Sequence, residues 1–344
     1  MRFAVRLPTS NRVAETAAIV DVARAAEELG FWAVSVHDHV VFNGAWVACG
    51  APDATGGGDD RDMYEALTTL AYVAGSTSTV RLMTGILLMP IRETVLAAKQ
   101  VATIDALSGG RMILGVGIGA ASRRGDAEQP LKLGAHAANA EKENATFGVR
   151  PGRGRLVNEQ LAAMRSIWTD ANASADGEFV CFDAIEVFPK PAQVGGPPIL
   201  VGGNSEAAMR RVLAHGDGWL PTAMSPREYA DGATRLRELA AAESRRRPPM
   251  LALNIFTALA DSDAAALGLA AASLGERFDP EHLRERNLVG SIATVADRLA
   301  DYAAAGVELV EFKPVYRSAG ELLELLERIA SDVMPRFPEA PPTD

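Results

Sequence analysis

The sequence predicts an α/β fold, a TIM (β/α)8 barrel with insertions after its second, fourth and seventh strands. Apolar runs of strand length alternate with amphipathic helical stretches along the chain, a pattern typical of parallel strands joined by helical crossovers. There are eight such pairs, and 344 residues suffice for a barrel of about 250 residues with insertions. Without a repeat or linker, one domain is expected over 1–344, with a core of about 2–335 and a tail at 336–344.

Each expected strand is a short apolar run next to a helical stretch. The eight runs are Arg2–Pro8, Trp32–Val40, Val80–Met89, Arg111–Gly119, Pro197–Gly203, Gly216–Thr222, Met250–Leu259 and Val307–Pro314. The three insertions, at Asn43–Asp62, Ala120–Arg155 and Ala260–Gly290, all follow strands and so lie at the barrel face that carries active sites. Ala171–Gly196 is expected to form a short hairpin before the fifth strand.

Composition narrows the function classes. Lys and Arg number 34 and Asp and Glu 44, a net charge of −10 without a basic block, which makes nucleic acid an unfavoured partner. No apolar run has the length of a membrane span, and the first residues lack the apolar core of a signal peptide, so we expect a cytoplasmic protein. Cys49 and Cys181 fit no metal-ligand spacing and are expected to be free thiols.

The second strand ends in His37-Asp38-His39, where the two histidines point to one side and Asp38 to the other. Three interpretations are open: a metal pair, a single histidine that acts on a ligand, or a polar cluster that only caps the barrel. A metal site needs further ligands at later strand ends, and the other histidines lie in insertions or in a helix, which disfavours it.

Glycines interrupt two strands at the same end of the barrel. Glycine weakens a strand, so Thr84-Gly85-Ile86 and the series Gly115, Gly117 and Gly119 indicate close packing or the close approach of a flat ligand ring. A dinucleotide fingerprint is disfavoured, because no helix opens after Gly119.

The fifth strand leads into a helix through Gly202-Gly203-Asn204-Ser205. Asn204 or Ser205 can cap this helix, and the same geometry offers backbone N–H groups to a phosphate. On the first and eighth strands, the charged residues that share a face are expected to pair inside the barrel. These residues are Arg2, Arg6, Glu311 and Lys313.

Three stretches together resemble the bacterial luciferase-like family of flavin and deazaflavin enzymes, and within it most closely the coenzyme F420-dependent oxidoreductases. They are SVHDHVV, VRLMTGILLMPIRETVLAAKQVATIDALSGGRMILGVGIG and GPPILVGGNSEAAMRRVLAHGDGWLP. The resemblance covers nearly the whole chain, from Phe3 to about Met334.

The resemblance implies a TIM barrel with a cofactor at its C-terminal mouth. It implies a cis peptide at Gly85-Ile86 that bulges against the cofactor ring beside Thr84, with His39 facing that ring and Asp38 holding His39. The remaining implied cofactor residues are Gly117 and Gly119 after the fourth strand and Gly202, Gly203 and Asn204 at the phosphate. Trp46 resembles in type an aromatic that lines the substrate side in some members.

The resemblance also implies the activity. The expected function is hydride transfer between coenzyme F420 and a small organic substrate. An FMNH2-dependent monooxygenase served by a partner flavin reductase is the alternative, and a flavin-binding protein without turnover is the second. Family members often carry a Glu shortly after the fourth strand, whereas this chain has no acid there until Asp126. A homodimer is expected, because members of the family are often dimers.

Overall fold

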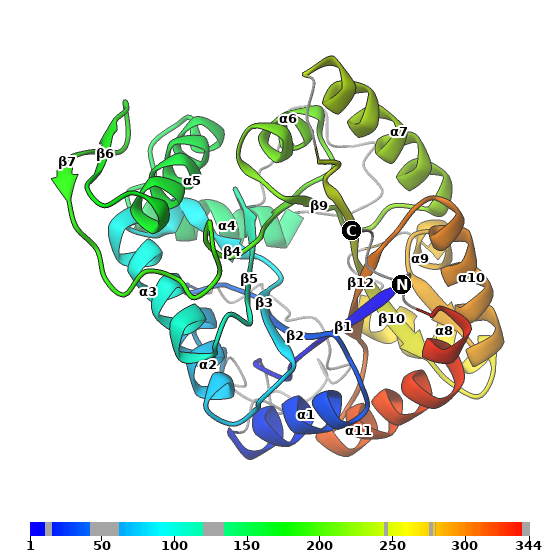
Figure 1. Ribbon diagram of the computed structural model, residues 1–344. Coiled ribbons are helices and arrows are strands. Elements are labelled where there is room, and N and C mark those ends of the chain that lie inside the picture. Colours follow the sequence, from blue (N-terminus) through cyan, green and yellow to red (C-terminus); the bar gives the residue numbers. More distant parts are fainter. Residues whose placement is uncertain are drawn as a thin grey trace.

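In the described part of the chain, eight parallel strands pair in a closed ring and helices cover its outside, so the predicted barrel is confirmed (Figure 1). The computed structural model describes residues 1–10, 16–41, 62–119, 134–243, 247–274, 278 and 280–338. The strands in ring order are β1 (Arg2–Arg6), β2 (Ala33–Val36), β3 (Arg81–Thr84), β5 (Met112–Gly117), β8 (Ile199–Gly202), β9 (Gly218–Leu220), β10 (Met250–Leu259) and β12 (Leu309–Pro314). Pairing of β12 with β1 closes the ring.

The helices connect successive strands. They are α1 (Thr16–Glu28), α2 (Ala66–Ala74), α3 (Thr94–Leu107), α4 (Gly134–Thr146), α5 (Arg153–Thr169), α6 (Glu206–His215), α7 (Pro226–Ala242), α8 (Asp263–Leu274), α9 (Pro280–Glu285), α10 (Ile292–Ala304) and α11 (Ala319–Arg328). Short turns of helix follow at η2 (Met89–Ile91), η4 (Ile329–Val333) and η5 (Met334–Arg336). None of the helices in the described ranges is long and apolar enough to cross a membrane.

The segments outside the eight units lie where the sequence predicts them. The predicted hairpin is the antiparallel pair β6 (Ala173–Asp176) and β7 (Cys181–Ile185). The insertion after the fourth barrel strand contains α4, and the one after the seventh contains α8, α9 and β11 (Leu288–Gly290), which pairs with β10. Phe337 and Pro338, placed in the tail, accept hydrogen bonds from the N-terminal ammonium of Met1.

The third barrel strand is interrupted. The expected strand Val80–Met89 is split into β3 and β4 (Leu87–Leu88), which both pair with β5. Between them lies the peptide Gly85-Ile86, which is cis, and the prediction for this bond is confirmed. The chain therefore bulges at the point where β3 reaches the C-terminal end of the barrel.

The barrel interior is layered along its axis. One buried apolar side chain from each of the eight strands fills the layer nearer the N-terminal ends. These residues are Ala4, Ala33, Met83, Ile113, Leu200, Leu220, Ala252 and Leu309. Two residues further along each strand, where side chains point to the same side, the layer is polar or glycine. That second layer holds Arg6, Ser35, Gly85, Gly115, Gly202, Thr222, Asn254 and Glu311. The apolar layer thus closes the barrel below a polar floor.

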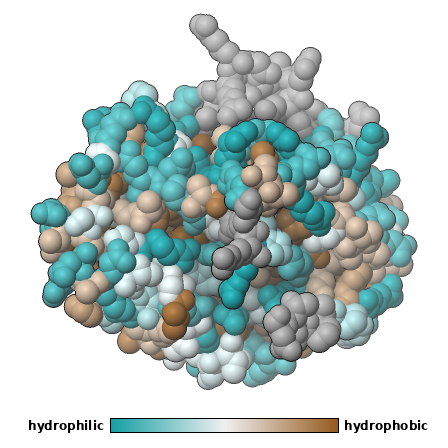
Figure 2. Space-filling model, turned by 45° about the horizontal axis from the view of Figure 1, so that its top comes forward, coloured by the Kyte–Doolittle hydropathy of each residue, from teal (hydrophilic) through white to brown (hydrophobic). Residues whose placement is uncertain are grey.

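The face shown in Figure 2 has hydrophilic residues interspersed with smaller apolar areas. Such a mixture is ordinary for a protein surface, of which more than half of the exposed area is usually apolar. On this face, surface hydropathy therefore does not single out a functional site, and the polar floor of the barrel remains the distinctive feature.

Glu27 at the end of α1 fixes the chain that enters β3. Its carboxylate accepts hydrogen bonds from the backbone amides of Ser78, Thr79 and Val80. Burial opposes ionisation, but these bonds outweigh it and lower the pKa of Glu27 from 4.5 to about 2.

Because the folded-state pKa is depressed, the contribution of Glu27 to stability is present above about pH 4.5 and is lost as the pH falls toward 2. We expect Glu27→Gln to lower the free energy of unfolding at pH 7 by about 1–2 kcal/mol. The difference from wild type should narrow below pH 4.5 in urea denaturation series. Glu28→Gln, at an exposed neighbour, is the control, and an equal loss in both variants would contradict the prediction.

Candidate active site

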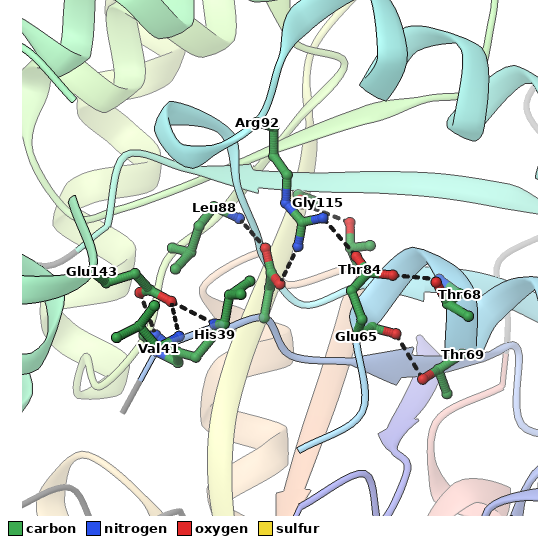
Figure 3. A network of polar contacts seen from close by, with 12 residues as sticks. His39, Val41, Glu65, Thr68, Thr69, Thr84, Leu88, Arg92, Gly115 and Glu143 are labelled. Carbon is green, nitrogen blue, oxygen red and sulfur yellow. Dashed lines mark hydrogen bonds and ion pairs between the residues drawn. The ribbon is translucent and has the colours of Figure 1, made fainter. Parts of the chain in front are cut away.

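Asp38 is anchored at the C-terminal end of β2. Its side chain is buried, with Oδ2 accepting a hydrogen bond from the Leu88 amide at 2.9 Å and Oδ1 one from Arg92 Nη2 at 2.5 Å. Arg92 also donates to Glu65 at 2.6 Å, so it bridges two carboxylates (Figure 3). Burial raises the pKa of Asp38, and the Arg92 guanidinium and the Leu88 amide oppose that shift. Asp38 thus ties the segment that carries His39 to β4.

His39 contacts a carboxylate that the sequence does not single out. Its Nδ1 lies 2.9 Å from Oε2 of Glu143 on α4, and the other oxygen, Oε1, accepts hydrogen bonds from the amides of Val40 and Val41 at 2.5 and 3.1 Å (Figure 3). Asn139, one helical turn earlier, donates to the Val41 carbonyl. Helix α4 therefore clamps the chain that follows β2 from one side.

The clamp fixes the protonation of both partners. Burial opposes ionisation of Glu143, but the hydrogen bonds from His39, Val40 and Val41 outweigh it, so the pKa of Glu143 is lowered. An ionised carboxylate only accepts hydrogen bonds, so Nδ1 of His39 carries a proton. The Nε2 atom is then the one that accepts or releases a proton, in the manner of histidines oriented by a carboxylate.

The polar floor of the barrel is a connected network around Glu311. This fully buried carboxylate accepts hydrogen bonds from Ser35 Oγ at 2.6 Å and from Asn254 Nδ2, and its Oε1 lies 3.4 Å from Arg6 Nη2. Arg6 Nη2 also donates to the carbonyl of Gly85, the first residue of the cis peptide, at 2.7 Å. The predicted pairing inside the barrel is confirmed for Arg6 and Glu311.

The remaining two charges of that prediction have other contacts. Arg2 lies over the ring of Trp32 with its guanidinium carbon 5.1 Å from the ring centroid. Lys313 donates to Thr222 Oγ1 at 2.8 Å, and its Nζ lies 3.9 Å from the centroid of the Phe256 ring. Two strands adjacent in the ring thus share one ion pair rather than two.

The strand glycines make room for the bulge. A Cβ on Gly115 would lie 2.0 Å from the carbonyl oxygen of Thr84, and one on Gly117 would lie 1.9 Å from Cδ1 of Ile86. Thr84 itself is fully buried and donates from Oγ1 to the Gly115 carbonyl at 2.7 Å. A Cβ on Gly85 would meet the Glu311 carboxylate. Close packing between β3, β5 and β12 therefore accounts for these glycines, and cofactor contact by Thr84, Gly85, Ile86 and Gly117 stays a prediction.

The predicted phosphate segment ends β8 and opens α6. Ser205 is the N-cap, with its side chain accepting from the Ala208 amide, and Gly203 has a φ of +113°. The Asn204 side chain is held at both ends, since Nδ2 donates to the Thr222 carbonyl and Oδ1 accepts from the Thr222 amide. Asn204 thus joins the ends of β8 and β9 and leaves the backbone N–H groups of α6 as the donors for an anion.

A basic side chain that the sequence does not single out lies beside Gly119. Arg153, the first residue of α5, donates from Nη1 to the Ile118 carbonyl at 3.2 Å, and a Cβ on Gly119 would lie 3.4 Å from the same Nη1. Arg211 of α6 donates to the Gly154 carbonyl at 3.1 Å, which brings the start of α5 against α6. A guanidinium and the N-terminal end of a helix are groups that bind phosphate, so these residues fit the phosphate end of a flavin-type cofactor.

Two other predicted features have different outcomes. Trp46 lies outside the described residues, so its place on the substrate side stays a prediction. His37 is separated in role from His39, because its Nδ1 lies 3.4 Å from Thr9 Oγ1 and it faces the ends of β1 and β12. Within the described ranges, no group of three or more His, Cys, Asp or Glu side chains is arranged to hold a metal ion.

Comparison with family models decides the affiliation. The model of the luciferase-like monooxygenases matches residues 1–287. The chain belongs to the luciferase-like monooxygenase family. The resemblance inferred from the sequence motifs is thereby confirmed, and the barrel described above is the luciferase-like barrel.

Relatives of this luciferase-like protein are distributed over both kinds of cofactor. An uncharacterised protein of Mycobacterium tuberculosis is 29% identical over 96% of this chain and 98% of its own. An F420-dependent hydroxymycolic acid dehydrogenase of the same species is 27% identical over 75% of this chain and 63% of its own. An FMNH2-dependent dimethylsulfone monooxygenase of Pseudomonas fluorescens is 25% identical over 72% of each chain.

Solved structures confirm the fold. The structure of an F420-dependent secondary alcohol dehydrogenase in complex with an F420-acetone adduct superposes with a TM-score of 0.77. It covers 98% of this luciferase-like chain and 99% of the other at 16% identity, a level at which the similarity concerns the fold alone.

Proposed function

We propose that this protein is an oxidoreductase that uses coenzyme F420 for hydride transfer to or from a small organic substrate at the C-terminal mouth of the barrel. The observation that carries the proposal is the contact between His39 and Glu143, which fixes an imidazole at the mouth in one tautomer. When bound, the deazaflavin supplies the two-electron chemistry, and the protein supplies binding, orientation and proton handling.

The role of His39 follows from this geometry. Glu143 holds the ring through Nδ1, and Asp38 fixes the neighbouring backbone through Leu88 and Arg92. Nε2 then holds or releases the proton that accompanies hydride transfer. The side chain of His39 is 9% exposed and that of Glu143 is 1% exposed, so water has little access to the pair.

The F420-dependent relative supports the cofactor, as do Gly203, the α6 amides and Arg153 at the proposed phosphate end. The FMNH2-dependent relative supports the alternative, a monooxygenase served by a partner flavin reductase. The interpretation as a flavin-binding protein without turnover rested on the missing acid after the fourth strand. Glu143 is such an acid, in contact with His39, and this favours an enzyme.

Cofactor titration tests the proposal. Oxidised F420 and FMN are added separately to the purified protein, and binding is followed by quenching of cofactor fluorescence. We expect F420 to bind at least tenfold more tightly than FMN. Arg153→Met should weaken F420 binding by about tenfold because one charged contact to the phosphate is lost, whereas Arg227→Met, at an exposed residue of α7, should not.

Preferential binding of FMN would instead support the monooxygenase and its partner reductase. Failure of both cofactors to bind would overturn the proposed function. Gel filtration of the same preparation tests the proposed homodimer, which a monomer at all concentrations would contradict.

A further inference from the structure

A pocket with about 260 Å³ of empty volume lies at the ends of β1, β2 and β12. Its described lining is Arg6, Leu7, Ser10, His37, Lys313, Pro314 and Tyr316. His37 precedes His39 by two residues, and Arg6 donates to the Gly85 carbonyl. The pocket therefore adjoins the proposed site of hydride transfer and is distinct from the Gly202–Asn204 and Arg153 end.

The lining offers hydrogen-bond donors in excess. Arg6 Nε is buried and has no hydrogen-bond partner among the described residues, although leaving such a donor unpaired is costly. Lys313 and Tyr316 are only 6% and 8% exposed, so their polar ends are largely removed from bulk water. Burial raises the pKa of the Tyr316 hydroxyl well above its ordinary range, so it stays a donor at neutral pH.

The charge of the described lining is positive. Arg6 and Lys313 contribute two cations, and no carboxylate lines the pocket. The Glu311 carboxylate behind it lies 3.4 Å from Arg6 and offsets one of these charges. In a poorly hydrated setting, a net charge near +1 favours a ligand with a single negative charge over a neutral ligand or a dianion.

We propose that this pocket binds the carboxylate of the substrate, so that the substrate is a small organic acid held between Arg6 and Lys313. The planar fork of Arg6 suits a carboxylate, and Lys313 and the Tyr316 hydroxyl supply further donors. The assignment rests on the proposed function for the word substrate, whereas the anion pocket itself is tested by binding alone.

Isothermal titration of the full chain, saturated with F420 or FMN if either binds, provides the test. The probes are straight-chain carboxylates from acetate to hexanoate, each compared with its primary amide at constant ionic strength. At least one acid should bind at least tenfold more tightly than its amide. Lys313→Met should weaken binding of that acid by at least tenfold and leave binding of the amide within twofold, and Arg227→Met should change neither.

Tyr316→Phe provides a second measurement, since it removes one donor and no charge. It should weaken binding of the acid about threefold, which keeps the test decisive if Lys313→Met does not fold. Equal affinity of acids and amides, or unchanged affinity in the folded variants, would overturn the inference. Displacement of the acid by equimolar inorganic phosphate would also overturn it, because the pocket would then prefer a phosphate group.

The outcomes separate this inference from the proposed function. Acid binding that depends on Lys313, in a protein that binds neither cofactor, would leave the pocket standing and overturn the redox function. Cofactor binding without any acid binding would do the reverse.

Discussion

Replacement of His39 by alanine is expected to lower kcat by about 100-fold or more. General acid or base catalysis by a positioned side chain contributes about 10²- to 10⁴-fold, and His39 is the imidazole that Glu143 fixes at the mouth of the barrel. Steady-state kinetics with the substrate found by screening organic acids and carbonyl compounds measures the effect. Affinity for the cofactor, followed by fluorescence, should change by less than threefold. Unchanged kcat in a folded His39→Ala protein would remove His39 from the mechanism.

Glu143→Gln separates positioning from chemistry. The amide keeps the shape of the side chain but places a donor next to groups that already donate, namely His39 Nδ1 or the Val40 and Val41 amides. We therefore expect kcat to fall about tenfold with KM nearly unchanged. Because the pKa of Glu143 is lowered, wild-type activity should show no loss from its protonation until the pH falls below about 4.5. Glu141→Gln, at an exposed residue of the same helix, is the matched control.

Gly115→Ala is expected to have the largest effect on stability. The new Cβ would lie 2.0 Å from the carbonyl oxygen of Thr84, and backbone on the neighbouring strand cannot rotate away. Overpacking of this kind costs about 3 kcal/mol, because β3 and β5 must separate where the Thr84 hydroxyl bonds to the Gly115 carbonyl. The free energy of unfolding from urea denaturation measures the loss.

Gly268→Ala is the control for that experiment. Gly268 lies in α8, and no atom lies within 4 Å of the position its Cβ would take. Alanine there is expected to raise the free energy of unfolding by about 0.5–1 kcal/mol, since glycine is unfavourable inside a helix. Equal stability of Gly115→Ala and wild type would show that the bulge can move and that close packing does not explain the glycine.

Local pattern was enough to predict the architecture. Alternating apolar runs and amphipathic helices gave the order of the eight units, because burial of one strand or one helix face is decided within about ten residues. The same pattern located the hairpin at β6 and β7 and the interruption of the third strand at Gly85-Ile86. Resemblance to a family then identified Asp38 and His39 as the residues to examine.

The sequence by itself therefore determined the barrel, its family and the end at which the site lies. Only the tertiary structure decided which groups meet there. Glu143 is 104 residues from His39, and nothing in its own helix distinguishes it from Glu141. Arg6 and Glu311 meet because the first and last strands close the ring. Such contacts depend on strand register and ring closure, which bring distant residues within hydrogen-bonding distance and leave no periodic signal in the chain.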